Sequence, residues 1–149
     1  MGIIKDFESG DKGELLVNEH LEKLGYTCEK NKDKETRQHY DLLILELNKT
    51  LEVKNDLYAV KSGNIAIEYN NCKSDKPSGL GITRADVWCH IIDNKPYVVT
   101  VKKLKTFVKE NTPKRIVTQA GDGNADLYLY SVEDAMKVFI PIERIGEIL

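Results

Sequence analysis

Helical spacing of apolar residues is confined to short stretches of this chain. Val17, Leu21 and Leu24 recur on one stripe of a helix that we expect over residues 13–24, and Gly25 supplies a stop. Two shorter helical segments are expected over residues 104–110, before Pro113, and from Ser131, which has the pattern of a helix N-cap.

Segments with the pattern of β-strands are more numerous than the helical ones. They are expected at residues 40–47, 51–54, 64–69, 85–92, 97–101 and 127–130. The polar stretches 31–39 and 70–81 are expected to be loops. The pattern therefore predicts an α/β fold, in which helices flank a mixed central β-sheet that begins with a three-stranded meander.

Length and composition exclude several classes of protein. The chain has 149 residues, which suits one domain over 1–149, and its net charge is −2 with 31% charged and 41% hydrophobic residues. These values are not those of a disordered, collagen-like or membrane protein. The first residues lack the basic and apolar regions of a signal peptide, so we expect a cytoplasmic protein with no membrane partner.

Cysteine usage gives no sign of a disulfide framework or a zinc site. The three residues Cys28, Cys72 and Cys89 are odd in number and include no C-x-x-C pair. Cys89 and His90 are adjacent in an expected strand, where neighbours point to opposite faces. We therefore expect three unpaired thiols.

The most informative chemistry lies in the expected hairpin. Glu52 and Lys54 are two residues apart in a strand and share one face, whereas Leu51 and Val53 point to the other. If the chain reverses between the two strands, Asp41 on the first strand lies beside them. Two carboxylates and an ammonium group would then converge, which suits a hard divalent cation and a phosphate.

Two further acids occupy positions that invite a functional interpretation. Glu14 lies beside Val17 on the apolar stripe of the first helix, where an acid is costly unless it is paired or useful. The alternative is a solvated residue in the first helical turn. Glu68 shares a face with Ala66 on the third strand and is expected near Lys54, the alternative being a solvent-facing side chain.

Glu14, Asp41 and the run Glu52-Val53-Lys54 together resemble the PD-(D/E)XK nuclease superfamily. Their order, spacing and strand context carry the resemblance, which covers roughly residues 10–100. It implies a restriction-endonuclease-like core. His39-Tyr40 stands where the proline that gives the superfamily its name would be.

Small size and the order helix, hairpin, strand are similar to those of Holliday-junction resolvases and short phage or archaeal endonucleases. Residues 63–69, Lys76-Pro-Ser-Gly79 and Thr83-Arg-Ala-Asp86-Val-Trp88 also resemble phage-type members of this group.

The resemblance implies roles for these residues. Asp41 and Glu52 would be ligands of Mg²⁺ or Mn²⁺, and the Val53 carbonyl would complete the site. Mg²⁺ prefers oxygen ligands and keeps several waters, so two carboxylates suffice.

The remaining catalytic roles implied by the resemblance belong to three side chains. Lys54 would orient or activate a water molecule, or offset charge on the phosphorane. Glu14 would hold a metal or a water. Glu68 would be an auxiliary group that bonds Lys54 or a metal-bound water.

Candidate DNA contacts lie in or near the loop that follows the third strand. They are Lys73, Lys76, Ser78 and Arg84, which could reach backbone phosphates. Gly79 and Gly81 would let the backbone approach closely. Trp88 could stack on a base, although its apolar strand favours a place in the core.

A second group of bases lies between residues 102 and 115, where six basic residues stand against one acid. It could bind a polyanion, or it could be only the solvated face of a helix.

The expected function is metal-dependent hydrolysis of DNA phosphodiester bonds, with branched or junction DNA among the possible substrates. Alternatives are an RNA-directed or repair nuclease and a non-catalytic nucleic-acid-binding module with the same fold. A homodimer is expected if the protein resolves junctions, because two symmetric cuts need two sites.

Overall fold

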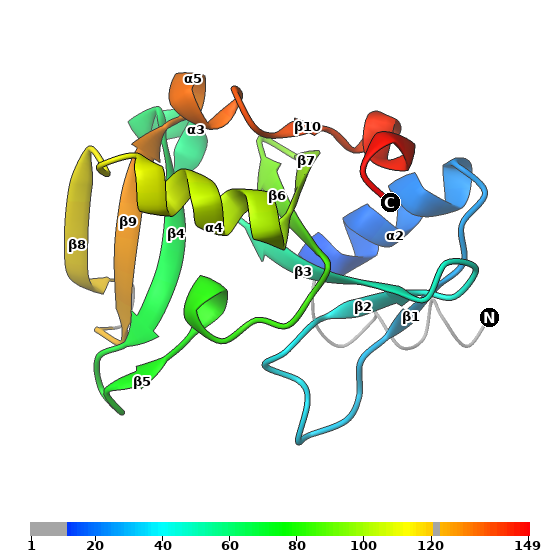
Figure 1. The fold of residues 1–149 in the computed structure, drawn as a ribbon, viewed down its shortest axis with the longest axis horizontal. Helices are drawn as coiled ribbons and strands as arrows, with labels where there is room; N and C mark the ends of the chain where they lie inside the picture. Colours follow the sequence, from blue (N-terminus) through cyan, green and yellow to red (C-terminus); the bar gives the residue numbers. More distant parts are fainter. Residues whose placement is uncertain (1–11, 121–122) are drawn as a thin grey trace.

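A computed structural model describes residues 12–120 and 123–149 of the chain. Two β-sheets lie beside each other, with short helices packed on them (Figure 1). The six-stranded sheet and helix α2 lie to the right in Figure 1, and the four-stranded sheet lies to the left.

The six-stranded sheet has the order β1-β2-β3-β6-β7-β10. Its strands are β1 (Cys28–Lys30), β2 (Leu42–Ile44), β3 (Lys49–Asn55), β6 (Val87–Ile92), β7 (Lys95–Thr100) and β10 (Ile140–Pro141). The β3–β6 pair is parallel and the other neighbouring pairs are antiparallel. The sheet is therefore mixed, as the sequence predicts.

The four-stranded sheet is antiparallel, with the order β5-β4-β9-β8. Its strands are β4 (Asn64–Asn71), β5 (Lys76–Pro77), β8 (Arg115–Ala120) and β9 (Ala125–Ser131). The six-stranded sheet does begin with a three-stranded meander, β1-β2-β3, but the prediction that residues 64–69 form its third strand is wrong. The hairpin β2–β3 forms, but β4 pairs with β9, and β6 takes the place beside β3.

Helices are few and mostly short. They are α2 (Lys12–Lys23), α3 (Ala59–Ser62), α4 (Val101–Glu110), α5 (Val132–Ala135) and the 3₁₀ helices η1 (Gly79–Gly81) and η2 (Ile142–Glu147). Helix α4 begins three residues before its expected start, because Thr100 caps it by accepting a hydrogen bond from the Lys103 N–H at 3.1 Å. Ser131 caps α5 in the same way, as expected.

Residues 70–81 are not only loop, because they include β5 and η1. Gly79 and Gly81 have a structural reason to be glycine. A Cβ at Gly79 would meet the carbonyl oxygen of Glu68, and one at Gly81 would meet that of Tyr69. These glycines thus let η1 pack against the β4 backbone, and a role in the approach of DNA stays a prediction.

Two hydrophobic clusters cover opposite faces of the six-stranded sheet. One contains Val17 and Leu21 of α2 together with Leu51 and Val53 of β3. The other includes Trp88 of β6, which is fully buried, with side chains of α4 and of the four-stranded sheet. Trp88 is therefore a core residue, and stacking on a base is not its role.

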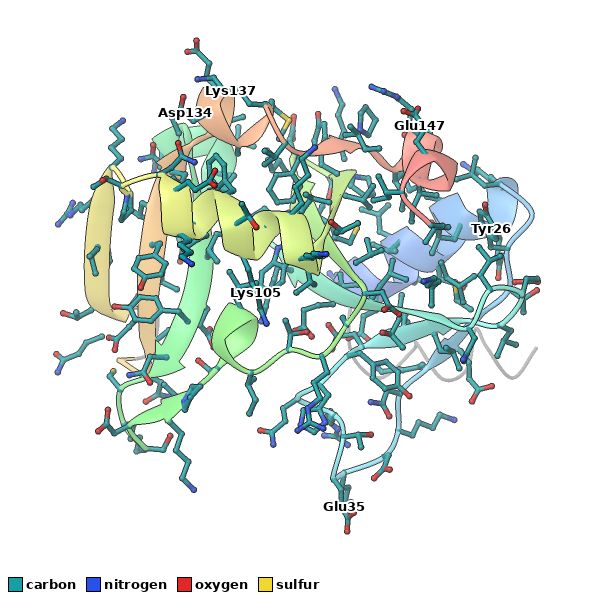
Figure 2. All side chains as sticks on the ribbon, viewed as in Figure 1. Tyr26, Glu35, Lys105, Asp134, Lys137 and Glu147 are labelled. Carbon is teal, nitrogen blue, oxygen red and sulfur yellow. The ribbon has the colours of Figure 1, made fainter. Side chains whose placement is uncertain are left out.

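The connection between β1 and β2, residues 31–41, projects from the sheets, with Glu35 at its outer tip (Figure 2). The three cysteines are unpaired, as expected. Within the described residues, no helix is both long enough and apolar enough to cross a membrane.

Candidate active site

Asp41 and Glu52 meet at the open end of the β2–β3 hairpin. Leu42 lies opposite Leu51, so Asp41, one residue earlier, lies beside Glu52. The Val53 N–H donates to Asp41 Oδ2 at 2.7 Å, which ties the acid of the first strand to the second. The chain reversal at Asn48, which has a positive φ of 52°, thus brings together the two carboxylates that the sequence singled out.

Glu52 is buried, with 6% of its surface exposed. Burial, and next to it the nearby charge of Asp41, raise the pKa of its carboxyl to about 8 against the opposing effects of Lys54 and Thr83. Two neighbouring carboxylates, one of them buried, repel each other when both are ionised. A cation bound between them would stabilise the ionised form of the pair.

Thr83 supports this carboxylate from the segment that leads into β6. Its Oγ1 lies 3.3 Å from Glu52 Oε1 and 3.0 Å from the His39 carbonyl oxygen. Asp86 of the same segment accepts from the N–H and hydroxyl of Thr50, at 2.9 and 3.2 Å. Residues 83–86 therefore hold the hairpin in place through Glu52 and Thr50.

Lys54 follows Glu52 on the same face of β3. Its Nζ lies 3.7 Å from Glu52 Oε2, and a third of its side chain is exposed. The parallel register sets Lys54 opposite His90 and Glu52 opposite Trp88. Lys54 is thus held beside the acid pair and still reaches solvent.

Glu14 is buried near the start of α2, with its Oε1 3.7 Å from Lys30 Nζ. The next residue, Asn31, donates its N–H to the Asp41 carbonyl oxygen at 2.9 Å. Glu14 is therefore not a solvated first-turn acid, and β1 links it to the neighbourhood of Asp41. Its contact with a metal or a water stays a prediction.

Glu68 and Lys54 line the same pocket, as expected, but they come from different sheets. Ile65 and Ile67 point into the core on the other face of β4, so the expected alternation of this strand is correct. Glu68 and Lys54 are close because the edge of β4 lies against the end of β3. The two strands do not pair.

The candidate DNA contacts differ in accessibility. Lys73, Lys76 and Arg84 are exposed. The Oγ of Ser78 is buried and has no hydrogen-bond partner within the described residues. A phosphate could reach this hydroxyl only if the segment moved, so we leave Ser78 out of the proposed contact set.

A buried hydrogen-bonded chain beside Lys54 was missed by sequence reasoning. The Trp88 indole N–H donates to His90 Nδ1 at 3.2 Å, and His90 Nε2 lies 2.9 Å from Asp56 Oδ2. Burial alone would raise the pKa of Asp56, but hydrogen bonds from His90 and from the N–H groups of Ala66 and Tyr58 hold it below its ordinary value. The sequence held two signals for it. Asp56 continues the two-residue spacing that places Glu52 and Lys54 on one face, and His90 is a polar residue in an apolar strand.

The described residues contain no cluster of three or more His, Cys, Asp or Glu placed to hold a metal. The oxygen donors that meet are the two carboxylates of Asp41 and Glu52. Comparisons with family models, with curated proteins and with solved structures found no match for this chain.

Proposed function

We propose that this protein is a metal-dependent endonuclease that hydrolyses DNA phosphodiester bonds and has a restriction-endonuclease-like core. The observation that carries the proposal is the convergence of Asp41, Glu52 and Lys54 at the end of one hairpin. Glu52 is buried, and Lys54 Nζ lies 3.7 Å from it. Two acids and an ammonium group in this arrangement suit a cation and a phosphate together.

The donor set fits Mg²⁺ or Mn²⁺. Both carboxylates are hard oxygen ligands, and neither Cys28 nor Cys89 shares their surroundings, because both thiols pack in the hydrophobic core. Asp41 and Glu52 would hold the ion, with the Val53 carbonyl as a further ligand. Such an ion polarises the scissile phosphodiester and lowers the pKa of a bound water.

Lys54 supplies the positive charge of the protein itself at this place. Because its Nζ is partly exposed and held beside Glu52, it can contact a phosphate oxygen or orient an attacking water. Lys54→Ala should lower the cleavage rate by about 10²–10⁴-fold. Lys54→Arg should restore little, since a planar guanidinium does not replace a compact point charge.

Glu14 and Glu68 would assist from two sides. Glu14, paired with Lys30, would order a water or the metal from the α2 side. Glu68 would act from the four-stranded sheet, across the pocket that it shares with Lys54.

The test is cleavage of radiolabelled branched, single-stranded and duplex DNAs with Mg²⁺ and with chelator. We expect cutting only with the cation and its loss in Glu52→Gln. The matched control is Glu29→Gln, which changes an exposed glutamate on β1 of the same sheet and should leave the rate unchanged.

Robust cutting by the pure protein in chelator would contradict the proposal. So would a Glu52→Gln variant that cuts at the wild-type rate. Metal-independent binding of DNA with no cutting of any substrate would instead favour a binding module with this fold.

A further inference from the structure

A small pocket adjoins Lys54 where the two sheets meet. It has a volume of about 190 Å³ and lies between the end of β3, the edge of β4 and His90 of β6. Lys54 and Glu68 stand in its wall, so the pocket is continuous with the proposed catalytic residues.

The rim of this pocket carries two large apolar side chains that the fold leaves in solvent. Leu57 is 76% exposed and Tyr58 is 78% exposed, and both line the pocket. Adjacent exposed side chains of this size beside a polar site offer apolar surface to a ligand. A tyrosine ring at the mouth of a nuclease pocket offers a stacking face for a base.

The floor of the pocket is rigid. Because an indole N–H can only donate, His90 Nδ1 accepts from Trp88 and the ring presents Nε2–H to Asp56. Asp56 Oδ2 also accepts from the Ala66 N–H of β4 at 2.9 Å. His90 is 1% exposed, so the chain of bonds is shielded from water and joins the floor to both sheets.

Size limits what the pocket can hold. A cavity of roughly 150 Å³ binds one benzene ring, and drug-sized ligands need about 300–1,000 Å³. The pocket at about 190 Å³ therefore accommodates one substituted six-membered ring. The polar groups Asn55 and Glu68 in its wall can bond the edge of such a ring, and Leu127 provides an apolar side.

We infer that this pocket binds one unstacked, pyrimidine-sized base of the DNA substrate, next to the phosphate held at Lys54, with Tyr58 stacked on it at the mouth. The inference rests on the proposed function and narrows its substrate class to DNA that has an unpaired nucleotide at the cleavage site. An unpaired base enters such a pocket most readily, because it has already lost its partner.

The test compares two duplexes that differ at one position, an unpaired thymine nucleotide in one and an abasic site in the other. Binding is measured by fluorescence anisotropy with Ca²⁺ in place of Mg²⁺, so that DNA is bound without being cut. Stacking of one base on an aromatic side chain corresponds to about a 5- to 140-fold preference for the duplex with thymine. In Tyr58→Ala that preference should fall to nearly one.

Val60→Ala is the matched control. Val60 is 61% exposed on α3, which begins directly after Tyr58, but it lines a neighbouring pocket and not this one, so its variant should keep the preference. Equal affinity of the wild-type protein for both duplexes would overturn the inference. So would a preference that survives Tyr58→Ala or that Val60→Ala also removes.

The cleavage assay separates this inference from the proposed function. Mg²⁺-dependent cutting without a preference for the thymine nucleotide would support the proposed nuclease function and overturn the inference that the pocket binds a base. A preference that depends on Tyr58, without cutting of any DNA, would support the pocket and overturn the nuclease.

Discussion

At the scale of single residues, the ionisation of buried Glu52 should make the free energy of unfolding depend on pH. Its carboxyl has a pKa raised from 4.5 to about 8, so the folded protein binds the proton more tightly than the unfolded chain does between these values. The free energy of unfolding should therefore fall as the pH rises from 4.5 to about 8, by on the order of a few kcal/mol without metal.

Urea unfolding in chelator across this pH range checks the prediction. Glu52→Gln cannot ionise and should lack the fall, so wild type and variant should diverge as the pH rises. Adding Mg²⁺ at the upper end should restore the wild type and leave the variant unchanged. Parallel pH profiles of the two proteins in chelator would show that Glu52 is not the buried acid described here.

Asp41 differs from Glu52 because its side chain accepts a hydrogen bond from a backbone N–H group. Its Oδ2 accepts from the Val53 N–H at 2.7 Å, and Asp41→Ala would leave that donor without this partner. We expect Asp41→Ala to destabilise the fold by about 1–3 kcal/mol. Asp41→Asn, which keeps an oxygen at this place, should be close to wild type in stability yet inactive.

Thermal or urea unfolding measured with the cleavage rate separates the two effects. An inactive and stable Asp41→Asn, with a destabilised Asp41→Ala, is the expected pair. If Asp41→Asn cuts at the wild-type rate, Asp41 does not take part in the chemistry.

The strand period predicted part of the candidate site because it is a local property. Glu52 and Lys54 share a face from spacing alone, and Asp41 follows once a hairpin is assumed. Lys30, Thr83 and His90 could not be placed in the same way. Each reaches the site from a separate segment, through pairing that depends on the whole fold and not on local spacing.

At the scale of elements, hydrogen bonds at the end of β3 connect the two sheets. Asp56 accepts from His90 of β6 and from the Ala66 N–H of β4, so one carboxylate connects three strands. Asp56→Ala would leave buried donors unpaired and should lower the free energy of unfolding by ~3 kcal/mol. The variant should also weaken cleavage, since β4, which carries Glu68, would lose a hydrogen bond to the end of β3.

Asp134→Ala serves as the control, because Asp134 pairs with Lys137 on the surface and both side chains are more than half exposed (Figure 2). It should change stability very little. Since the pKa of Asp56 lies below 3.8, its contribution is present above that pH and is lost as the pH falls further. The gap between wild type and Asp56→Ala should therefore close in acid, and a gap of the same size at every pH would contradict this account.

Strand identity was more predictable than strand pairing. The alternation of residues 64–69 correctly sets Ile65 and Ile67 toward the core and Glu68 away from it. The same alternation fits a strand of either sheet, so it could not show that β4 pairs with β9, whose sequence lies about sixty residues away. The strands β1 and β5 were missed because three and two residues are too few to show a period.

At the scale of the whole molecule, charge must act locally. The net charge is −2, so affinity for a polyanion has to come from a patch of bases and not from the overall field. Among the described residues, the candidate bases Lys73 and Lys76 around β5 are exposed, and so are Lys102, Lys103 and Lys105 on α4. Lys105 extends from the side of α4 on which η1 is drawn in Figure 2.

We expect DNA binding to weaken with salt and to depend on both sets of bases. Each phosphate contact that is lost should reduce the slope of log affinity against log salt by about 0.9 on duplex DNA. The measurement is a salt series in Ca²⁺ with two variants, one changing Lys73 and Lys76 to Gln and the other changing Lys102, Lys103 and Lys105 to Gln. A slope that falls only in the first variant would make the α4 bases a solvated face, since both variants remove exposed charges that the fold does not need. An unchanged slope in both would show that the DNA is held elsewhere, even if Asp41, Glu52 and Lys54 prove catalytic.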